Sequence, residues 1–324
     1  MTNGIGAAPP RSPESLLERI QAKRGGWLRF AVFGLATIGI FVLLFTQIDY
    51  GQVLRTLRSA RPAWVLAAFA WTLTFPVFSA LRFRRMLAAL GHEVSFRDCF
   101  DMVMAAWPMG TITPSKSGDL MKAYYLKDRV PVGQVVGSVL AERILDVLVL
   151  LALAAFGCVL FQRWVLAAAA GAGFVGGLGG LLLGLRFRLP LPAKLTTKLE
   201  PVLDALRRLA RSPSVLLPVL LYTLLNWFAS VIQTVFAYRA FGAQVPLLFT
   251  IGALPLAIFV GLLPFTLSGM GTRDAALIAL FARFAPKEVS LGVGILYSLF
   301  GYWIPAVVGL PFLHRVLPRS GKKS

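Results

Sequence analysis

The chain has 324 residues, of which 57% are hydrophobic and only 15% are charged, and its mean hydropathy is +0.73. This composition excludes an ordinary soluble domain and a disordered chain, and it indicates an integral membrane protein. The formal net charge of +19 then belongs to a small aqueous surface. Basic loops beside membrane spans favour anionic lipid as a partner, and since no nucleic-acid-binding motif is present we expect no nucleic acid partner.

The few cysteines and histidines argue against several kinds of chemistry. The two Cys and two His residues form no HExxH motif and no cluster with metal-ligand spacing. No nucleotide-binding P-loop is present either. We therefore expect no metal, no other cofactor and no enzymatic activity, and any energy source should be a gradient or the membrane potential.

About six apolar stretches are long enough to cross a membrane, because roughly 20 helical residues span about 30 Å of hydrocarbon. We expect a cytoplasmic N-terminal segment at 1–26, a first membrane repeat at 27–161, a second at 162–313 and a basic cytoplasmic tail at 314–324. The predicted spans are Trp27–Ile48, Pro62–Leu81, Val132–Phe161, Trp164–Leu185, Val215–Ala237 and Val289–Leu313.

Two interrupted segments separate these spans. In the first, an apolar arm from Cys99 to Trp107 is broken near residues 108–119, and a new helix opens at Asp119. In the second, an arm from Pro246 to Leu263 is broken near 264–274 and a helix opens at Arg273. Bare backbone at membrane depth is tolerated only where protein or water covers it. Paired interrupted segments mark the substrate site in the two halves of many transporters, so we interpret both as re-entrant broken helices.

The distribution of basic residues predicts the orientation. The segment after Leu81, which begins with Arg82, Arg84 and Arg85, and the basic amphipathic segment at 186–213 are expected in the cytoplasm. If both interrupted segments enter and leave on one side, the cytoplasmic pieces hold 23 Lys and Arg residues and the outer pieces 6. This asymmetry favours cytoplasmic termini and a multi-pass protein of the cytoplasmic (inner) membrane. The two halves then share one order of elements with opposite orientation, so the predicted fold is an all-α membrane protein with an inverted repeat.

The span Trp164–Leu185 is rich in glycine, with small-xxx-small pairs such as Gly173 and Gly177. This pattern predicts close helix packing rather than a ligand loop. The partner is either another helix of the same chain or a second protomer, which leaves a homodimer possible.

Charged residues inside apolar stretches are the strongest functional signal, because each is costly to insert. Glu142, Arg143 and Asp146 lie in one span, and Glu142 and Asp146 share a helix face. One hypothesis is a buried ion-pair knot that ties this helix to Arg273 or Lys122. The alternative is that the three residues line a cavity, balance a charged headgroup or carry a coupling proton.

Both breaks combine free helix N–H groups with basic side chains, which suits a phosphate. The candidate binding or cavity residues are Lys116, Ser117, Asp119, Lys122, Glu142, Arg143, Asp146, Ser268, Arg273 and Asp274. The lysines of the first break could instead extend to the interface and attract anionic lipid. Asn226 and Gln233, on one helix face, could extend the polar lining, although hydrogen bonding between helices is the simpler role.

The segments RFRRMLAALG, TPSKSGDLMKAYYL, AERILD and PFTLSGMGTRDAAL resemble the flippase-like transmembrane domain of lysylphosphatidylglycerol synthases, over about residues 27–313. The resemblance implies that its motif positions are filled by Pro114, Gly118, Asp119, Glu142, Arg143, Asp146, Gly271, Arg273 and Asp274. Two of them, Asp119 and Asp274, stand where Glu is more usual in that family. The 324 residues leave no room for the soluble aminoacyl-transferase domain, so we expect no lipid-aminoacylating activity in this polypeptide.

These observations predict a lipid flippase or transporter that moves the headgroup of an anionic phospholipid or a polyprenyl-phosphate-linked lipid. In this hypothesis Lys116, Lys122 and Arg273 bind phosphate, while carboxylates such as Glu142 balance or couple charge. Two alternatives remain, a membrane transferase acting on a lipid phosphate and a non-transporting scaffold.

Overall fold

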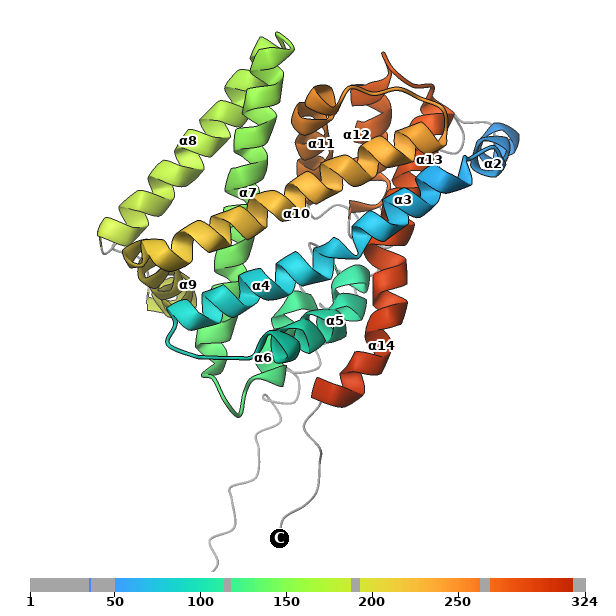
Figure 1. Ribbon diagram of the computed structural model, residues 1–324. Helices are drawn as coiled ribbons and strands as arrows, with labels where there is room; N and C mark the ends of the chain where they lie inside the picture. Colours follow the sequence, from blue (N-terminus) through green and yellow to red (C-terminus); the bar gives the residue numbers. More distant parts are fainter. Residues whose placement is uncertain (1–34, 36–49, 114–117, 188–192, 263–268, 317–324) are drawn as a thin grey trace, which may run out of the picture.

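The computed structural model describes residues 35, 50–113, 118–187, 193–262 and 269–316, and these residues form helices joined by short turns (Figure 1). The first predicted span, Trp27–Ile48, lies outside the described residues except for Leu35. The helices are α2 (Tyr50–Arg58), α3 (Pro62–Thr72), α4 (Thr74–Ala89), α5 (Phe96–Ile112), α6 (Met121–Tyr125), α7 (Val132–Leu160), α8 (Trp164–Arg186), α9 (Ala193–Arg211), α10 (Pro213–Ala240), α11 (Leu247–Leu262), α12 (Thr272–Phe281), α13 (Lys287–Ser298) and α14 (Ile304–Val316), with a π-helical turn at Leu299–Trp303 between the last two.

Within these described ranges, five helices are long and apolar enough to cross a membrane. They coincide with the five predicted spans that follow the first one, and α7, α8 and α10 begin or end within three residues of the predicted limits. The fold is therefore an all-helical bundle with several membrane-length helices. Two of these units combine several elements: Pro62–Ala89 joins α3 and α4, and Lys287–Val316 joins α13, the π turn and α14.

The second predicted span is longer than we expected. The prediction that it ends at Leu81, with Arg82 in a cytoplasmic loop, is wrong, because α4 continues to Ala89 and Arg82 is only 4% exposed. Phe83, Met86 and Leu87 are also buried and continue the inner face of the helix. Arg84 and Arg85 point outward. The helical period thus carries one arginine of this basic cluster into the protein and leaves the other two at its surface.

The two interrupted arms, α5 and α11, pack in a reciprocal way. Helix α5 of the first half lies along α14 of the second half, and α11 of the second half lies along α7 of the first (Figure 1). A glycine lies in each contact. A Cβ atom on Gly309 of α14 would collide with the carbonyl of Met104, and one on Gly157 of α7 would collide with the backbone of Gly252. Glycine at these sites therefore allows backbone-to-backbone packing.

After each break the chain returns to the end of its own arm. A Cβ atom on Gly118 would overlap the backbone of Met109 and Gly110, and one on Gly269 would overlap the backbone of Gly261. The two glycine pairs, 110 with 118 and 261 with 269, have the same separation in sequence. Gly269 also has φ of +73°, a conformation that favours glycine. In both halves, the glycine that follows the break therefore lies against the glycine near the end of the preceding arm.

Helix α8 lies at the edge of the molecule, where it contacts α7 and α9 (Figure 1). Cβ atoms on Gly173 and Gly177 would meet Leu151 and Leu148 of α7, so part of the predicted glycine packing is within the chain. Gly176 and Gly180 are on an open face, where an added Cβ atom would meet no atom of the described chain within 4 Å. The oligomeric state stays a prediction.

The segment from Arg186 to Pro213, expected to be a basic amphipathic loop, is helical over Ala193–Arg211. It forms helix α9, whose buried side chains Val202, Leu206 and Leu209 pack against α4, α7 and α10. The amphipathic pattern of this segment explains its placement, since one face is apolar and the other carries Arg and Asp side chains. Helix α9 therefore packs against the part of α7 that carries Ala141 and Leu145.

Candidate functional site

A cavity of about 100 Å³ lies between the two halves of the chain. This volume has room for several water molecules, since each needs about 10–15 Å³. The first half contributes charged groups to the lining, and the second half contributes mostly aromatic and hydroxyl groups. The polar and aromatic lining includes Arg82, Asp119, Lys122, Arg143 and Asp146 from the first half and Asn226, Trp227, Ser230, Arg273, Tyr297 and Tyr302 from the second.

Arg82 is the central cation of the first half. Its Nη1 donates to Asp146 Oδ1 at 2.6 Å and to Thr223 Oγ1 at 3.3 Å, and its Nη2 lies 3.4 Å from Asp146 Oδ2. Trp227 Nε1 donates to the same carboxylate at 3.1 Å. Because both ions are almost fully buried, the pair is stable only while each keeps its partner. This contact ties α4 and α10 to α7.

Glu142 is held more loosely. Its Oε1 lies 3.7 Å from Arg82 Nε, and its Oε2 lies 3.9 Å from Lys122 Nζ. Glu142 is only 1% exposed, and neither its Oε1 nor Arg82 Nε has a hydrogen-bond partner within the described part of the chain. Glu142 is therefore a buried carboxylate that two cations attract at distances beyond a normal hydrogen bond.

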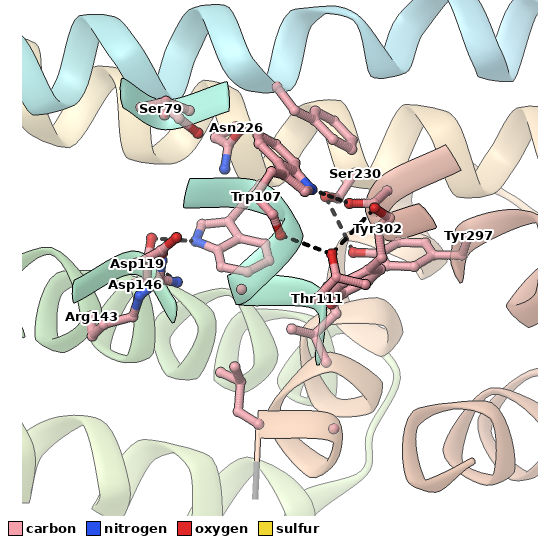
Figure 2. A pocket seen from close by; sticks show the side chains of 18 of the residues that line it. Ser79, Trp107, Thr111, Asp119, Arg143, Asp146, Asn226, Ser230, Tyr297 and Tyr302 are labelled. Atoms are coloured by element: carbon pink, nitrogen blue, oxygen red, sulfur yellow. Dashed lines mark hydrogen bonds and ion pairs between the residues drawn. The ribbon is translucent and has the colours of Figure 1, made fainter. Parts of the chain in front are cut away.

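Arg143 connects this cluster to the first break. Its Nη2 pairs with Asp119 Oδ2, at the start of the helical segment after the break, and its Nη1 lies 3.4 Å from Asp146 Oδ2. Figure 2 shows Asp119, Asp146 and Arg143 gathered on one side of the cavity, with Thr111, Ser230, Tyr297 and Tyr302 on the other. The cavity thus has a charged side and an aromatic side.

On the aromatic side lies Arg273. Among the described residues that line the cavity, it is the only arginine from the second half. It is 2% exposed, and its Nη2 donates to Asp274 Oδ1 at 2.9 Å and to Ser298 Oγ at 2.6 Å. Its guanidinium carbon lies 4.5 Å from the centre of the Tyr297 ring and 5.6 Å from that of Tyr302. Its Nη1 has no hydrogen-bond partner among the described residues. Unpaired buried donors are rare and require an explanation.

Asp274 holds Arg273 in place rather than lining the cavity. Its Oδ2 accepts from the N–H of Gly271 at 3.0 Å, which caps the start of α12, while its Oδ1 accepts from Arg273. Gly271 has φ of +87°, so glycine is favoured at this cap. The guanidinium is therefore fixed by a carboxylate that is itself fixed by the backbone.

The π-helical turn joins the cavity to α5. Pro305 has no N–H, so the carbonyl of Gly301 loses its usual partner in the helix. Trp107 Nε1 donates to that carbonyl at 3.2 Å, and Thr111 Oγ1 lies 3.3 Å from the carbonyl of Tyr302 (Figure 2). Such turns are frequent at functional sites. Here the turn also carries Tyr302 into the lining.

The structure brings together most of the candidate residues. Asp119, Lys122, Arg143, Asp146 and Arg273 line one cavity, while Glu142 and Asp274 adjoin it as ion-pair partners. The hypothesis that Lys122 pairs with the charged span agrees with the Lys122–Glu142 contact, whereas Arg273 pairs with Asp274 instead. The other three candidates, Lys116, Ser117 and Ser268, lie outside the described residues.

The two polar residues of α10 have different roles. Gln233 Nε2 donates to Thr72 Oγ1 at 2.9 Å and so joins α10 to α3, as expected for hydrogen bonding between helices. Asn226 lines the cavity, and its Oδ1 has no hydrogen-bond partner in the described chain. Sequence reasoning missed Arg82, Trp107 and Trp227. For Arg82 a signal exists, because Phe83, Met86 and Leu87 continue an apolar face beyond it.

Comparisons with known proteins agree with a membrane assignment. A family model described as "Lysylphosphatidylglycerol synthase TM region" matches residues 26–309. The chain is 24% identical over 315 residues to a UPF0104 membrane protein of Methanothermobacter thermautotrophicus, and this match covers 86% of this chain and 92% of that protein. It is 21% identical over 310 residues to UPF0104 membrane protein MJ1595 of Methanocaldococcus jannaschii, covering 83% and 90%.

A third relative is described as an enzyme. Over 123 residues the chain is 28% identical to the protein named Glycosyltransferase AglD of Haloferax volcanii, and the match covers 37% of this chain and 20% of that protein. Together with the apolar helices, the two long matches identify a multi-pass membrane protein.

Proposed function

Because the chain belongs to the family of lysylphosphatidylglycerol synthase TM regions, we propose that it moves the phosphate-bearing headgroup of a lipid, either a phospholipid or a polyprenyl-phosphate-linked lipid, across the cytoplasmic membrane. The headgroup occupies the cavity between the two halves, and its tails stay in the bilayer. Unaided movement is slow because a polar group in hydrocarbon loses hydration without compensation. A lined cavity lowers that barrier without covalent chemistry.

The observation that carries this proposal is the unused donor of Arg273. A guanidinium presents N–H groups in a planar fork that suits phosphate oxygens. Three contacts, to Asp274, Ser298 and Tyr297, fix the orientation of this group, and yet Nη1 has no partner within the described residues. A phosphate oxygen in the cavity would satisfy it. Lys122, which also lines the cavity, supplies a second cation for the same headgroup.

We further propose that the two breaks are re-entrant hairpins of an inverted repeat, with both termini in the cytoplasm. Three observations support this. The packing of α5 on α14 and of α11 on α7 is reciprocal, the two breaks fold back at glycine pairs of equal separation, and both halves line the cavity. In transporters with this architecture, movement of one repeat against the other opens the site alternately to each side.

Reconstituted vesicles test the proposal. The full chain is incorporated into vesicles that contain a trace of phosphatidylglycerol with a fluorophore on one acyl chain, and a membrane-impermeant quencher is added outside. We expect the quenched fraction to rise from about half, the outer leaflet alone, towards completeness. Equal quenching with and without the protein, for this lipid and for a fluorescent polyprenyl phosphate, contradicts the function. Uptake of radiolabelled inorganic phosphate without lipid movement also contradicts it, because the carried group is then free phosphate.

Arg273 provides the specific variant. In the double variant R273M/D274N, cation and carboxylate are removed together, so no buried charge is left without its partner. A charge-assisted hydrogen bond is worth about 1.5–3 kcal/mol, so we expect the rate to fall about 10- to 100-fold. The matched control is Arg283→Met, an exposed arginine that lies just beyond α12 and also contacts an aromatic ring. It should leave the rate unchanged.

A membrane transferase is the second candidate, and the similarity to Glycosyltransferase AglD favours it. That match covers only 20% of the named glycosyltransferase, so it is a weaker argument than the cavity. Formation of a new lipid product from a lipid-phosphate donor by the purified chain would favour the enzyme over the flippase.

A further inference from the structure

The buried charges of the cavity balance in number. Counted over the described residues that line it or pair with its lining, four cations face four carboxylates, so an anionic headgroup would leave one negative charge without compensation. The cations are Arg82, Lys122, Arg143 and Arg273, and the carboxylates are Asp119, Glu142, Asp146 and Asp274. An uncompensated charge at a buried site is strongly unfavourable. Among the described residues, a bound lipid phosphate is therefore balanced only if a further positive charge enters with it.

We propose that this charge is a proton taken up by Glu142, so that the lipid phosphate and one proton cross the membrane together. The inference rests on the proposed function and specifies its coupling ion. With Glu142 ionised, the site is neutral and empty of anion. With Glu142 protonated and one phosphodiester bound, it is neutral again, since one proton and one negative charge have been added.

Glu142 is the carboxylate that loses least on protonation. Asp146 accepts from Arg82 at 2.6 Å and from Trp227 at 3.1 Å, Asp274 accepts from Arg273 and from the Gly271 N–H, and Asp119 is paired directly with Arg143. Glu142 makes only the 3.7 Å and 3.9 Å contacts, and its Oε1 accepts no hydrogen bond from any described residue. A protonated Glu142 sacrifices two long ion pairs and no short one.

Protonation also releases the cations that the headgroup needs. Arg82 and Lys122 both line the cavity, whereas Glu142 lies behind them and is not part of the lining. Lys122 Nζ rests 4.9 Å from the ring centre of Phe83 as well. Once Glu142 is neutral, these two cations carry a positive charge that faces the cavity. The bound phosphate then replaces Glu142 as their counter-ion, and its departure on the other side restores the original pairs as Glu142 loses the proton.

The groups around Glu142 leave few other carriers for this proton. Helix α4 contributes Arg82 and α6 contributes Lys122, while α5 contributes the buried Cys99 thiol, which lies within the electrostatic reach of Glu142. On α7 itself Arg143 and Asp146 are neighbours. Helix α10 presents the neutral side chains of Thr223 and Trp227 to Asp146 and Arg82.

The remaining neighbours of α7 contribute no titratable side chain here. The acidic residues of α9 pair at the surface with its own arginines, Glu200 with Arg207 and Asp204 with Arg208. Helix α11 contains no ionisable side chain, and the only one in α8 is Arg186 at its end. Glu142 is thus the least constrained acid next to the cavity.

The coupling can be measured because it makes the transport of a monoanion electroneutral. Vesicles with the full chain and a trace of fluorescent phosphatidylglycerol are given a difference of one pH unit across the membrane. We expect the probe to concentrate about tenfold in the leaflet that faces the alkaline side, the limit for one proton per lipid. A potential set by a potassium gradient and valinomycin at equal pH should not redistribute it. If the anion moved without a proton, the probe would ignore the pH difference and would redistribute with the potential.

Each outcome decides the coupling. If the probe crosses but ignores the pH difference, or follows the potential, the coupling is wrong and the proposed flippase stands. If it does not cross at all, the proposed function itself fails. In E142Q, which resembles the protonated form, the probe should cross and distribute equally at any pH difference. Concentration of the probe by E142Q would show that another group carries the proton. The wild-type measurement needs no variant and decides the matter even if E142Q does not fold.

Discussion

Removal of the Arg82 side chain should destabilise the protein more than removal of any surface arginine. The variant R82M replaces the aliphatic stem of the side chain with a similar apolar chain and deletes the cation that contacts both Asp146 and Glu142. Asp146 is then left with Arg143 at 3.4 Å and Glu142 with Lys122 at 3.9 Å. Breaking a buried pair in this way costs about 3–5 kcal/mol. In chains of 150–250 residues, each kcal/mol lost in the free energy of unfolding lowers the melting temperature by at least about 2 °C. The melting temperature of R82M should therefore fall by roughly 6–10 °C.

The assay is thermal unfolding of the purified protein in detergent, and Arg85→Met is the matched control. Arg85 is on the same helix, one turn away, and is exposed, so its removal should change stability by less than about 0.5 kcal/mol. The double variant R82M/D146N removes both charges of the closest pair and should recover part of the loss. A difference of 1 °C corresponds to roughly the 0.5 kcal/mol expected of surface changes. If the melting temperatures of R82M and R85M differ by less than this, the buried network contributes nothing to stability and the reasoning is refuted.

Two further predictions concern the packing of the two halves. Gly157→Val should lower the melting temperature by several degrees, on the order of the 1–3 kcal/mol that overpacking costs, because its side chain collides with Gly252 of α11. The control Gly180→Val, on the open face of α8, should leave the melting temperature unchanged. Equal melting temperatures of the two variants would contradict the α7–α11 contact. Trp107→Phe should slow lipid movement and lower the free energy of unfolding by about 1–3 kcal/mol, because it removes the indole N–H that donates to the Gly301 carbonyl. A Trp107→Phe protein with wild-type melting and transport would show that water replaces the indole there.

The sequence predicted the spans and the site for the same physical reason. Charged or polar residues within apolar stretches are costly, so they mark positions where the protein supplies compensation. This argument selected Glu142, Arg143 and Asp146, while the second break selected Arg273, and the structure places all four in or beside one cavity. It did not identify the partners, because helical periodicity gives the face of a residue but not which helix lies opposite.

Arg82 and the π turn show where such reasoning stops. An arginine after an apolar run is normally an interface anchor, so the prediction ended the span there, although the buried face continues to Leu87. At the π turn, Pro305 indicates an unpaired carbonyl at Gly301. The donor that satisfies this carbonyl, Trp107, is 194 residues away, and no local pattern connects the two. Both omissions involve contacts between elements that are distant in sequence.

Stability and transport should therefore respond to two arginines of one cavity to different degrees. The short hydrogen bonds of Arg82 are to Asp146 and Thr223, both within the protein, so its loss should lower the melting temperature as well as slow lipid movement. Arg273 is equally buried but keeps Nη1 without a partner in the described chain, so its loss should be measured mainly as slower lipid movement. Because a static structural network would need no spare donor, a transport defect in R273M/D274N at unchanged melting temperature would separate a binding site from a structural ion-pair knot.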